Sequence, residues 1–320
     1  MNIFITLDYE LYMSGNTGTV SNCIIKPVEK LMEVADKHQV KFSFFVDAAF
    51  LYRLYQLKDS CTQLIADYRT VCENIQMLDK CGHDVEMHFH PQWLYSDFMD
   101  GKWIVDMTHY KISDMDETFL FDVFEKSKMH LDSLLSSPTV SFRAGGYSLS
   151  SFAGFMDLFK RNNITIDSSV LRNSYCDSRF QSYNYIDVPI PNIYKISCDL
   201  CRMDESGSIV EASISTKRLS GIHYLLYRLL VKIKYWNNDA MGDGASIGGG
   251  KRSILSSKLI NASIDHYEIY KLKSFLQTTG DLIIIGHPKN QSEDSIKYLD
   301  NFIASTKEKH NYRTIEELAI

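Results

Sequence analysis

Short apolar runs alternate with amphipathic helical segments along most of this chain, and this alternation limits the fold more than any other feature. The first apolar run, NIFITLDYE, precedes a helical stripe formed by Val28, Leu31, Met32 and Ala35. Further strands are predicted in the stretches 40–47, 84–90, 139–146, 164–170 and 281–288, and further helices in 59–80, 116–135, 150–162, 265–278 and 292–306. Strands separated by helices form a parallel sheet or barrel with the helices outside, so we expect an α/β fold.

The regular alternation is interrupted over residues 171–262. This region holds a strand-like piece, YIDVPI (185–190), and an apolar, basic helix candidate, IHYLLYRLLVKIKYW (222–236). It also holds a glycine-rich loop, GDGASIGGGKR (242–252), which lacks the spacing of a phosphate-binding loop and is expected to lie over a site. We expect one catalytic domain over 1–320, with 171–262 as an insertion or an elaborated edge.

The helix candidate at 222–236 has two interpretations. Its leucines favour a helix packed on the body of the protein, and contact with a membrane surface is the alternative. The formal net charge of −6 indicates neither nucleic acid nor an anionic membrane as a partner.

The amino terminus, MNIFITLDYE, has no basic start, no long apolar core and no small-residue cleavage site. The chain also lacks a run of about 18 apolar residues that would form a transmembrane helix. The seven cysteines show no disulfide spacing, which favours reduced thiols. We therefore expect a cytoplasmic protein.

The stretch DVEMHFH (84–90) alternates polar and apolar side chains without a break. In a strand, Asp84, Glu86, His88 and His90 share one face. His88 and His90 could offer two nitrogen ligands to a metal, with Glu86 deeper in the strand as a supporting partner. Either histidine could equally make ordinary hydrogen bonds, because the HxH pattern alone is weak.

Other polar side chains fall at strand ends as well. Asp8 and Glu10 have the same parity in the first strand, and paired carboxylates suit one metal ligand and one proton-transfer group. Arg143, Asp167 and His287 lie near the ends of three later strands. In barrels of parallel strands, chemistry sits at the carboxyl ends, so these positions predict one active site.

The ordered set TLDYE, GHDVEMHFHP, FRAGGY and IIIGHP resembles the polysaccharide deacetylases of carbohydrate esterase family four, which have the NodB-homology fold. The resemblance covers roughly 1–170 and 265–318. It implies a distorted barrel of about seven β/α units. It also implies removal of an N-acetyl group from a sugar with a divalent metal, most often zinc.

The resemblance assigns a role to each matching residue. It makes Asp8 the catalytic base and Arg143 the residue that orients it, and it makes His287 the general acid. It places Tyr147 at the site that stabilises the oxyanion. The implied metal ligands are Glu10, His88 and His90. Asp167 is expected beside His287 as a further catalytic residue.

The sequence departs from the family pattern at three places near the implied metal site. Glu10 replaces the more common aspartate. Gln92 stands where the family has its second histidine, so His90 is the substitute ligand. The residues AGG replace the prolines that follow the family arginine.

Three functions follow from these observations. The first is a metal-dependent deacetylase acting on a carbohydrate, namely an acetamido sugar that is nucleotide-linked, lipid-linked or oligomeric, within surface polysaccharide synthesis. The second is a metal-independent C–N hydrolase acting on a small linear or cyclic amide. The third is a catalytically silent carbohydrate-binding homologue, which the presence of Gln92 favours.

Overall fold

A computed structural model describes residues 1–234, 239–245, 258–277 and 280–319 of the chain. Its centre is a nine-stranded sheet in the order β10-β11-β7-β6-β3-β2-β1-β14, with β15 also paired to β1. The strands of this sheet are β1 (Asn2–Tyr9), β2 (Ser43–Asp47), β3 (Asp84–Phe89), β6 (Ser141–Ala144), β7 (Ile166–Asp167), β10 (Ile193–Ile196), β11 (Ile209–Ala212), β14 (Leu282–Gly286) and β15 (Asn311–Arg313). All the pairings are parallel except that of β10 with β11.

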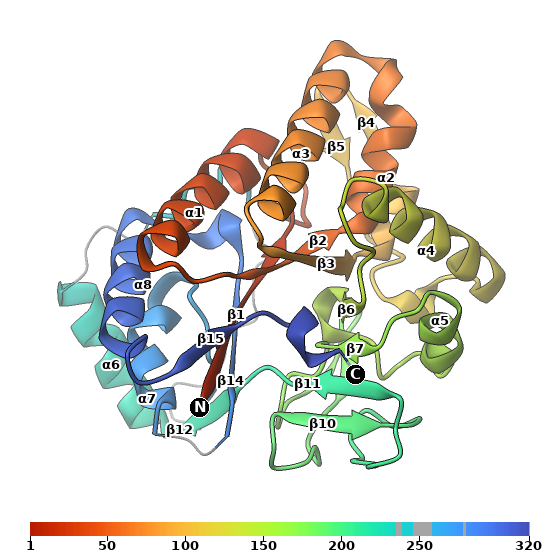
Figure 1. The fold of residues 1–320 in the computed structure, drawn as a ribbon. Coiled ribbons are helices and arrows are strands. Elements are labelled where there is room, and N and C mark those ends of the chain that lie inside the picture. Colours follow the sequence, from red (N-terminus) through yellow and green to blue (C-terminus); the bar gives the residue numbers. More distant parts are fainter. Residues whose placement is uncertain (235–238, 246–257, 278–279, 320) are drawn as a thin grey trace.

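Helices cover the outer face of this curled sheet (Figure 1). They are α1 (Lys26–His38), α2 (Ala48–Leu57), α3 (Thr62–Lys80), α4 (Glu117–Asp132), α5 (Phe155–Arg161), α6 (Gly221–Lys234), α7 (Leu272–Phe275) and α8 (Glu293–Thr306). β14, with the sequence LIIIG, is buried along its whole length, as expected for a strand covered on both faces. The expected α/β fold, a distorted (β/α) barrel, is confirmed.

The barrel is completed by irregular backbone between β11 and β14. Ser215 N donates to Ile283 O at 3.1 Å, and Ile264 N donates to Ile285 O at 3.0 Å. Ala262 N donates to Ser215 O at 2.8 Å and joins the two bridging segments. Because these segments replace regular strands, the barrel is distorted on this side.

Residues 171–262 contribute more than one kind of structure. They supply β10 and β11 to the main sheet. They also form two small antiparallel pairs, β8 (Tyr175–Asp177) with β9 (Ser182–Asn184), and β12 (Thr216–Leu219) with β13 (Lys258–Asn261). Residues 246–252 of the glycine-rich loop lie outside the described residues.

Three local features differ from the sequence-based expectation. The stretch 185–190 is a turn and not a strand, in keeping with two nearby prolines that cannot donate to a ladder. Helix α2 directly follows β2, with Asp47 as its cap, and was not predicted. A hairpin of β4 (Asp97–Met99) and β5 (Lys102–Ile104) was also not predicted; Asp100 and Gly101 at its turn both have positive φ.

None of the described helices combines the length and the apolar composition needed to cross a bilayer.

Candidate metal and catalytic site

The carboxyl ends of β1, β2, β3, β6 and β14 meet at one edge of the sheet because these strands are parallel neighbours. The register places His88 opposite Arg143 on the adjacent strand. The last paired residues of β1 and β14 put His287 at the level of Asp8. The topology therefore brings these four side chains, which are far apart in the sequence, into one region.

Glu10, His88 and His90 are all buried and each turns a ligand atom toward the same point. These atoms lie within 4.8 Å of one another. Glu10 Oε2 is 3.1 Å from His88 Nε2 and 2.8 Å from His90 Nε2. Two imidazole nitrogens and one carboxylate oxygen are a donor set that suits zinc and related divalent ions.

The far nitrogen of His88 has a fixed partner. Nδ1 donates to the Arg143 carbonyl oxygen at 2.8 Å, so Nε2 is the nitrogen directed at Glu10. The backbone of Arg143 therefore sets the orientation and tautomer of His88.

Gln92 is the corresponding partner of His90. The Gln92 amide nitrogen lies 3.2 Å from His90 Nδ1, while the amide oxygen has no hydrogen-bond partner among the described residues. A half-turn of the amide group exchanges its oxygen and nitrogen, and the oxygen then accepts the Nδ1 hydrogen of His90. In that arrangement His90 also directs Nε2 toward Glu10 Oε2, 2.8 Å away. Gln92 is thus the neighbour that can orient His90, a candidate ligand.

The ring of His90 also explains the glycine that replaces a bulkier residue after Arg143. A β-carbon added to Gly145 would stand 2.6 Å from His90 Nδ1 and 2.7 Å from its Cγ. Such contacts are too close for a real side chain. His90 and Gly145 are therefore linked, because the glycine leaves the space that the imidazole ring fills.

Asp8 is held by a fully buried Arg143. Arg143 Nη1 donates to Asp8 Oδ1 at 2.5 Å. Its remaining nitrogens donate to Thr6 Oγ1 and to both oxygens of Ser168, at 2.8–3.0 Å. Asp8 Oδ2 is left facing His88 Nε2 at 3.9 Å and His287 Nε2 at 3.7 Å.

His287 pairs with Asp265, a residue that the sequence did not single out. His287 Nδ1 lies 2.6 Å from Asp265 Oδ2, and His287 N donates to Oδ1 at 2.8 Å. Burial opposes protonation of His287, but the Asp265 carboxylate, with Asp8 and Glu10 nearby, raises its pKa to about 9. The imidazole is therefore charged at neutral pH and points Nε2 toward Asp8.

The expectation that Asp167 pairs with His287 is wrong, because Asp265 fills that place. Asp167 instead accepts from Ser169 Oγ at 2.6 Å and lies beside Glu211 on β11. Burial, and then the Asp167 charge, raises the pKa of Glu211 well above its usual range. Two neighbouring buried carboxyl groups are unfavourable when both are charged, so Glu211 is expected to hold its proton beside Asp167.

Lys289 is a second site residue that the sequence did not indicate. Its buried ammonium donates to Glu10 Oε1 at 2.7 Å and to Leu11 O at 2.8 Å. Burial would raise the pKa of Glu10, but Lys289, followed by the two histidines, holds it well below its usual range. Its position in GHPKN, two residues after His287, was the available signal.

The four polar side chains that alternate along β3 and the residue after it divide into two sets. His88 and His90 join Glu10 at the carboxyl end. Asp84 Oδ2 accepts from Ile315 N and Glu316 N at 3.1–3.2 Å, toward the opposite end of the strand. Glu86 Oε2 accepts from the backbone nitrogens of residues 140 and 141 at 2.7–2.9 Å. One sheet face therefore carries a candidate ligand pair and a structural pair.

Tyr147 lies near Asp8 and Arg143 in a strained backbone conformation. Its φ of 61° is in the left-handed region, which non-glycine residues rarely adopt. Burial, then the nearby Asp8, raises its pKa well above the usual range, so the hydroxyl keeps its hydrogen. Tyr185 holds the backbone by donating to Tyr147 O at 2.7 Å.

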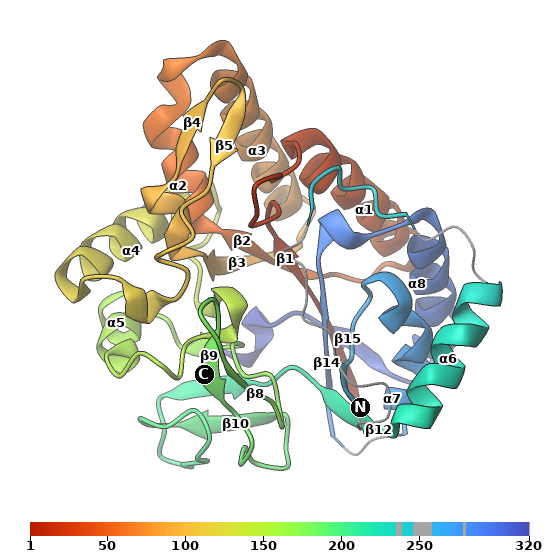
Figure 2. The same cartoon turned by 180° about the vertical axis from the view of Figure 1, so that it is seen from behind.

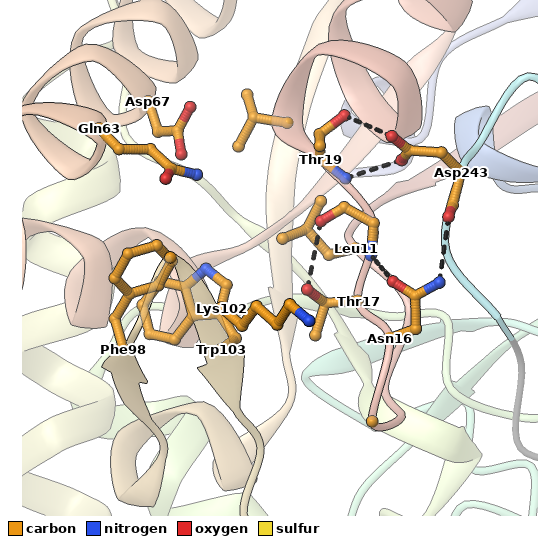
Figure 3. Close-up of a pocket in the computed structure, with 14 residues that line it drawn as sticks. Leu11, Asn16, Thr17, Thr19, Gln63, Asp67, Phe98, Lys102, Trp103 and Asp243 are labelled. Carbon is orange, nitrogen blue, oxygen red and sulfur yellow. Dashed lines mark hydrogen bonds between the residues drawn. The ribbon is translucent and has the colours of Figure 1, made fainter.

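A cavity of about 290 Å³ lies beside the loop that follows Glu10 (Figure 3). Side chains from that loop, from α3 and from the β4–β5 hairpin line it, including Leu11, Gln63, Asp67, Phe98, Lys102 and Trp103. Asp243 holds the loop by accepting from Thr19 N and Oγ1 at 2.8 and 2.9 Å. Among the described residues, its lining includes none of the candidate ligands, so this cavity is a groove beside the candidate metal site.

Solved structures with similar folds include two with TM-scores above 0.5. A polysaccharide deacetylase from Mycobacterium smegmatis, described as putative, has a TM-score of 0.55 and 13% identity, covering 99% of this chain and 88% of that one. Puue allantoinase has a TM-score of 0.52 and 10% identity, again covering 99% and 88%. The catalytic domain of a peptidoglycan N-acetylglucosamine deacetylase from Eubacterium rectale has a TM-score of 0.43 and 13% identity, covering 98% and 88%.

No family model matches this sequence, and no curated protein matches it. At these identities the likeness concerns the fold, and it extends over almost the whole chain. This agrees with the resemblance carried by the strand-end motifs. The chain thus has the fold of these two structures, one described as a putative polysaccharide deacetylase and the other as an allantoinase.

Proposed function

We propose that this chain is a metal-dependent hydrolase that removes the N-acetyl group from an acetamido sugar. The observation that carries the proposal is the buried meeting of Glu10, His88 and His90. It lies directly beside Asp8, a carboxylate held by an arginine, and His287, a histidine held by a carboxylate. A ligand set, a base and an acid are the parts that metal-assisted amide hydrolysis requires.

The residues present fit a divalent ion, and zinc is the ion we propose. Glu10, His88 and His90 would hold it. Both histidines have a partner on the far nitrogen, as metal-binding histidines in proteins almost always do. Lys289 occupies only Oε1 of Glu10, so that Oε2 remains directed at the histidines. When bound, the ion supplies Lewis acidity to the amide carbonyl and makes a water molecule more acidic.

Asp8 is the proposed base. Arg143 fixes one of its carboxylate oxygens, and the other remains to take a proton from the attacking water. The water oxygen forms a bond to the acetyl carbon and leaves in the acetate. Tyr147 lies nearby with its hydrogen retained and is the proposed donor to the carbonyl oxygen as negative charge develops there.

His287 is the proposed acid. Its pKa of about 9 keeps the imidazole protonated at neutral pH. It donates this proton to the sugar nitrogen as the C–N bond breaks, so that the amine leaves uncharged. Asp265 orients the ring and stabilises its charge.

The proposed substrate is an acetamido sugar linked to a nucleotide or a lipid, or a short oligomer, used within the cytoplasm for a surface polysaccharide. This choice follows from the sequence-based expectation of a cytoplasmic protein. Cell fractionation tests it, since recovery of the protein outside the cell would remove the cytoplasmic substrate.

The test measures acetate release from acetamido sugars by wild-type protein and by the Asp8→Asn and His88→Ala variants. Both variants, if folded, are expected to lose activity, with metal lost only from His88→Ala. Full activity in both variants would contradict the proposed metal-dependent deacetylation.

A second candidate is a metal-independent hydrolase acting on a small amide. The observation that favours it is Lys289, a fixed cation that already compensates Glu10. Activity that survives complete chelation would support this candidate over the first.

A further inference from the structure

Helix α6 exposes an apolar stripe that the rest of the described structure leaves uncovered. Its members are Ile222, Leu225, Leu226, Leu229 and Ile233, with exposed fractions between 50% and 72%. Their spacing follows the helical repeat, so they form one continuous face. The expectation that this helix packs its leucines on the body of the protein is therefore wrong.

The opposite side of α6 attaches the helix to the body. Lys271 lies 5.0 Å from the centre of the Tyr224 ring, and Gly221 is buried at the start of the helix. Figure 2 shows α6 as an outer element beside α7 and α8. The helix is thus held by one side while its aliphatic side faces solvent. Monomeric proteins seldom expose so contiguous an apolar face without a partner.

The segment of sequence that contains this face carries charge of one sign. Residues 212–238 contain no aspartate or glutamate but include Lys217, Arg218, Arg228, Lys232 and Lys234. This contrasts with the net charge of −6 for the whole chain. An aliphatic stripe within a basic segment is typical of helices that lie in the headgroup region of anionic bilayers.

We propose that α6 docks this protein on the surface of an anionic lipid bilayer. The helix lies along the surface and does not cross it, in keeping with its length and composition. A symmetric contact between two copies fits less well, because it would bring the basic residues of both copies together without acidic partners from the same segment. This proposal concerns binding alone and does not depend on the proposed reaction.

The docking face and the mouth of the barrel are close along the chain. Eight residues after Ile233, Met241 N donates to Gln291 O at 2.7 Å, and Gly242 N donates to Lys289 O at 3.1 Å. Eight residues span at most about 29 Å. Docking through α6 therefore holds the catalytic edge within that distance of the helix.

The experiment is co-flotation of the full-length protein with vesicles of phosphatidylcholine, with and without phosphatidylglycerol. We expect binding to the anionic vesicles that weakens at high salt. The triple variant Leu225→Gln, Leu229→Gln, Ile233→Gln is expected to bind at least about tenfold more weakly. All three positions are exposed, so folding should be retained and is checked by circular dichroism.

The matched control is the variant Ile65→Gln, Ile190→Gln, which alters exposed isoleucines elsewhere and is expected to bind as wild type. Three outcomes would overturn the proposal. They are no binding to anionic vesicles, equal binding by the triple variant, or a dimer in sedimentation velocity that the triple variant abolishes. The last would identify a second copy as the occupant of the face.

Discussion

The imidazole of His90 lies directly over the α-carbon of Gly145, where a β-carbon would meet Nδ1 at 2.6 Å. This contact joins a candidate metal ligand to the turn that follows Arg143. We expect Gly145→Ala to displace His90 and to lower zinc affinity by about 10- to 100-fold. Isothermal titration of the metal-free protein with zinc measures this.

The control for Gly145→Ala is Gly15→Ala. An added β-carbon at Gly15 meets nothing within 4 Å, so zinc affinity should stay at the wild-type value. Wild-type affinity in Gly145→Ala would show that His90 is not a ligand.

Gln92 offers a test of how His90 is oriented. Gln92→Leu removes the acceptor for His90 Nδ1 and should lower zinc affinity by about 10-fold or more. Gln92→Glu keeps an acceptor oxygen and should retain most of that affinity. Inductively coupled plasma mass spectrometry of dialysed proteins checks both. Equal metal content in the two variants would contradict the orienting role.

Lys289 compensates the charge of Glu10 in the absence of metal. We expect Lys289→Met to destabilise the metal-free protein by about 3 kcal/mol, because Glu10 is left buried and unpaired. Added zinc should restore more stability to this variant than to wild type, since the ion then supplies the missing positive charge. Thermal denaturation with zinc and with a chelator measures both effects.

Lys30→Met is the control for Lys289→Met. Lys30 also pairs with a glutamate, but on the exposed surface of α1. Exposed pairs contribute little, so the response to zinc should match that of wild type. A Lys289→Met protein as stable as wild type without metal would argue against the charge balance described here.

Asp265 holds His287 through both the ring nitrogen Nδ1 and the backbone nitrogen. We expect Asp265→Asn to lower kcat on the order of a hundredfold or more, because the amide cannot stabilise the charged imidazole, while metal content stays unchanged. Asp300→Asn breaks another aspartate–histidine pair, Asp300 with His38, and should leave kcat unaffected. A loss of metal in Asp265→Asn would assign Asp265 to the ligand set instead.

The buried pair of Asp167 and Glu211 makes stability depend on pH. The pKa of Glu211 is raised in the folded protein, so folding takes up protons above pH ~4, and its contribution to stability falls as pH rises toward that raised value. Glu211→Gln removes this dependence because the amide does not titrate. We expect the variant to lose less stability than wild type between pH ~5 and ~8.

Thermal denaturation across that pH range measures the difference, with Glu308→Gln, at an exposed position, as control. Parallel curves of stability against pH for wild type and Glu211→Gln would contradict the interpretation that Glu211 holds a proton in the folded protein. Asp167→Asn should keep most of its activity, because Asp167 belongs to this pair and Asp265 is the partner of His287.

The sequence by itself determined the fold class and indicated most of the side chains that meet at the candidate site. Strand parity put Glu10 on the side of Asp8 and His90 on the side of His88, and the alternation of strands with helices placed their ends at one edge. These signals are local and repeat every few residues, so they can be recognised without knowing which strands become partners. Helix α2 and the β4–β5 hairpin were not predicted, because short elements contain few repeats of the hydrophobic period.

Tertiary structure alone decided which groups meet. Asp265 and not Asp167 reached His287, since segment 262–264 hydrogen-bonds to β14 in a part of the chain without regular alternation. Lys289 donates to Glu10, although nearly the whole length of the sequence separates the two residues. The contacts of Gln92 and Gly145 with the ring of His90 could be seen only in the tertiary structure. Such pairings depend on which strands become neighbours and how loops pack, and no local period in the sequence records that choice.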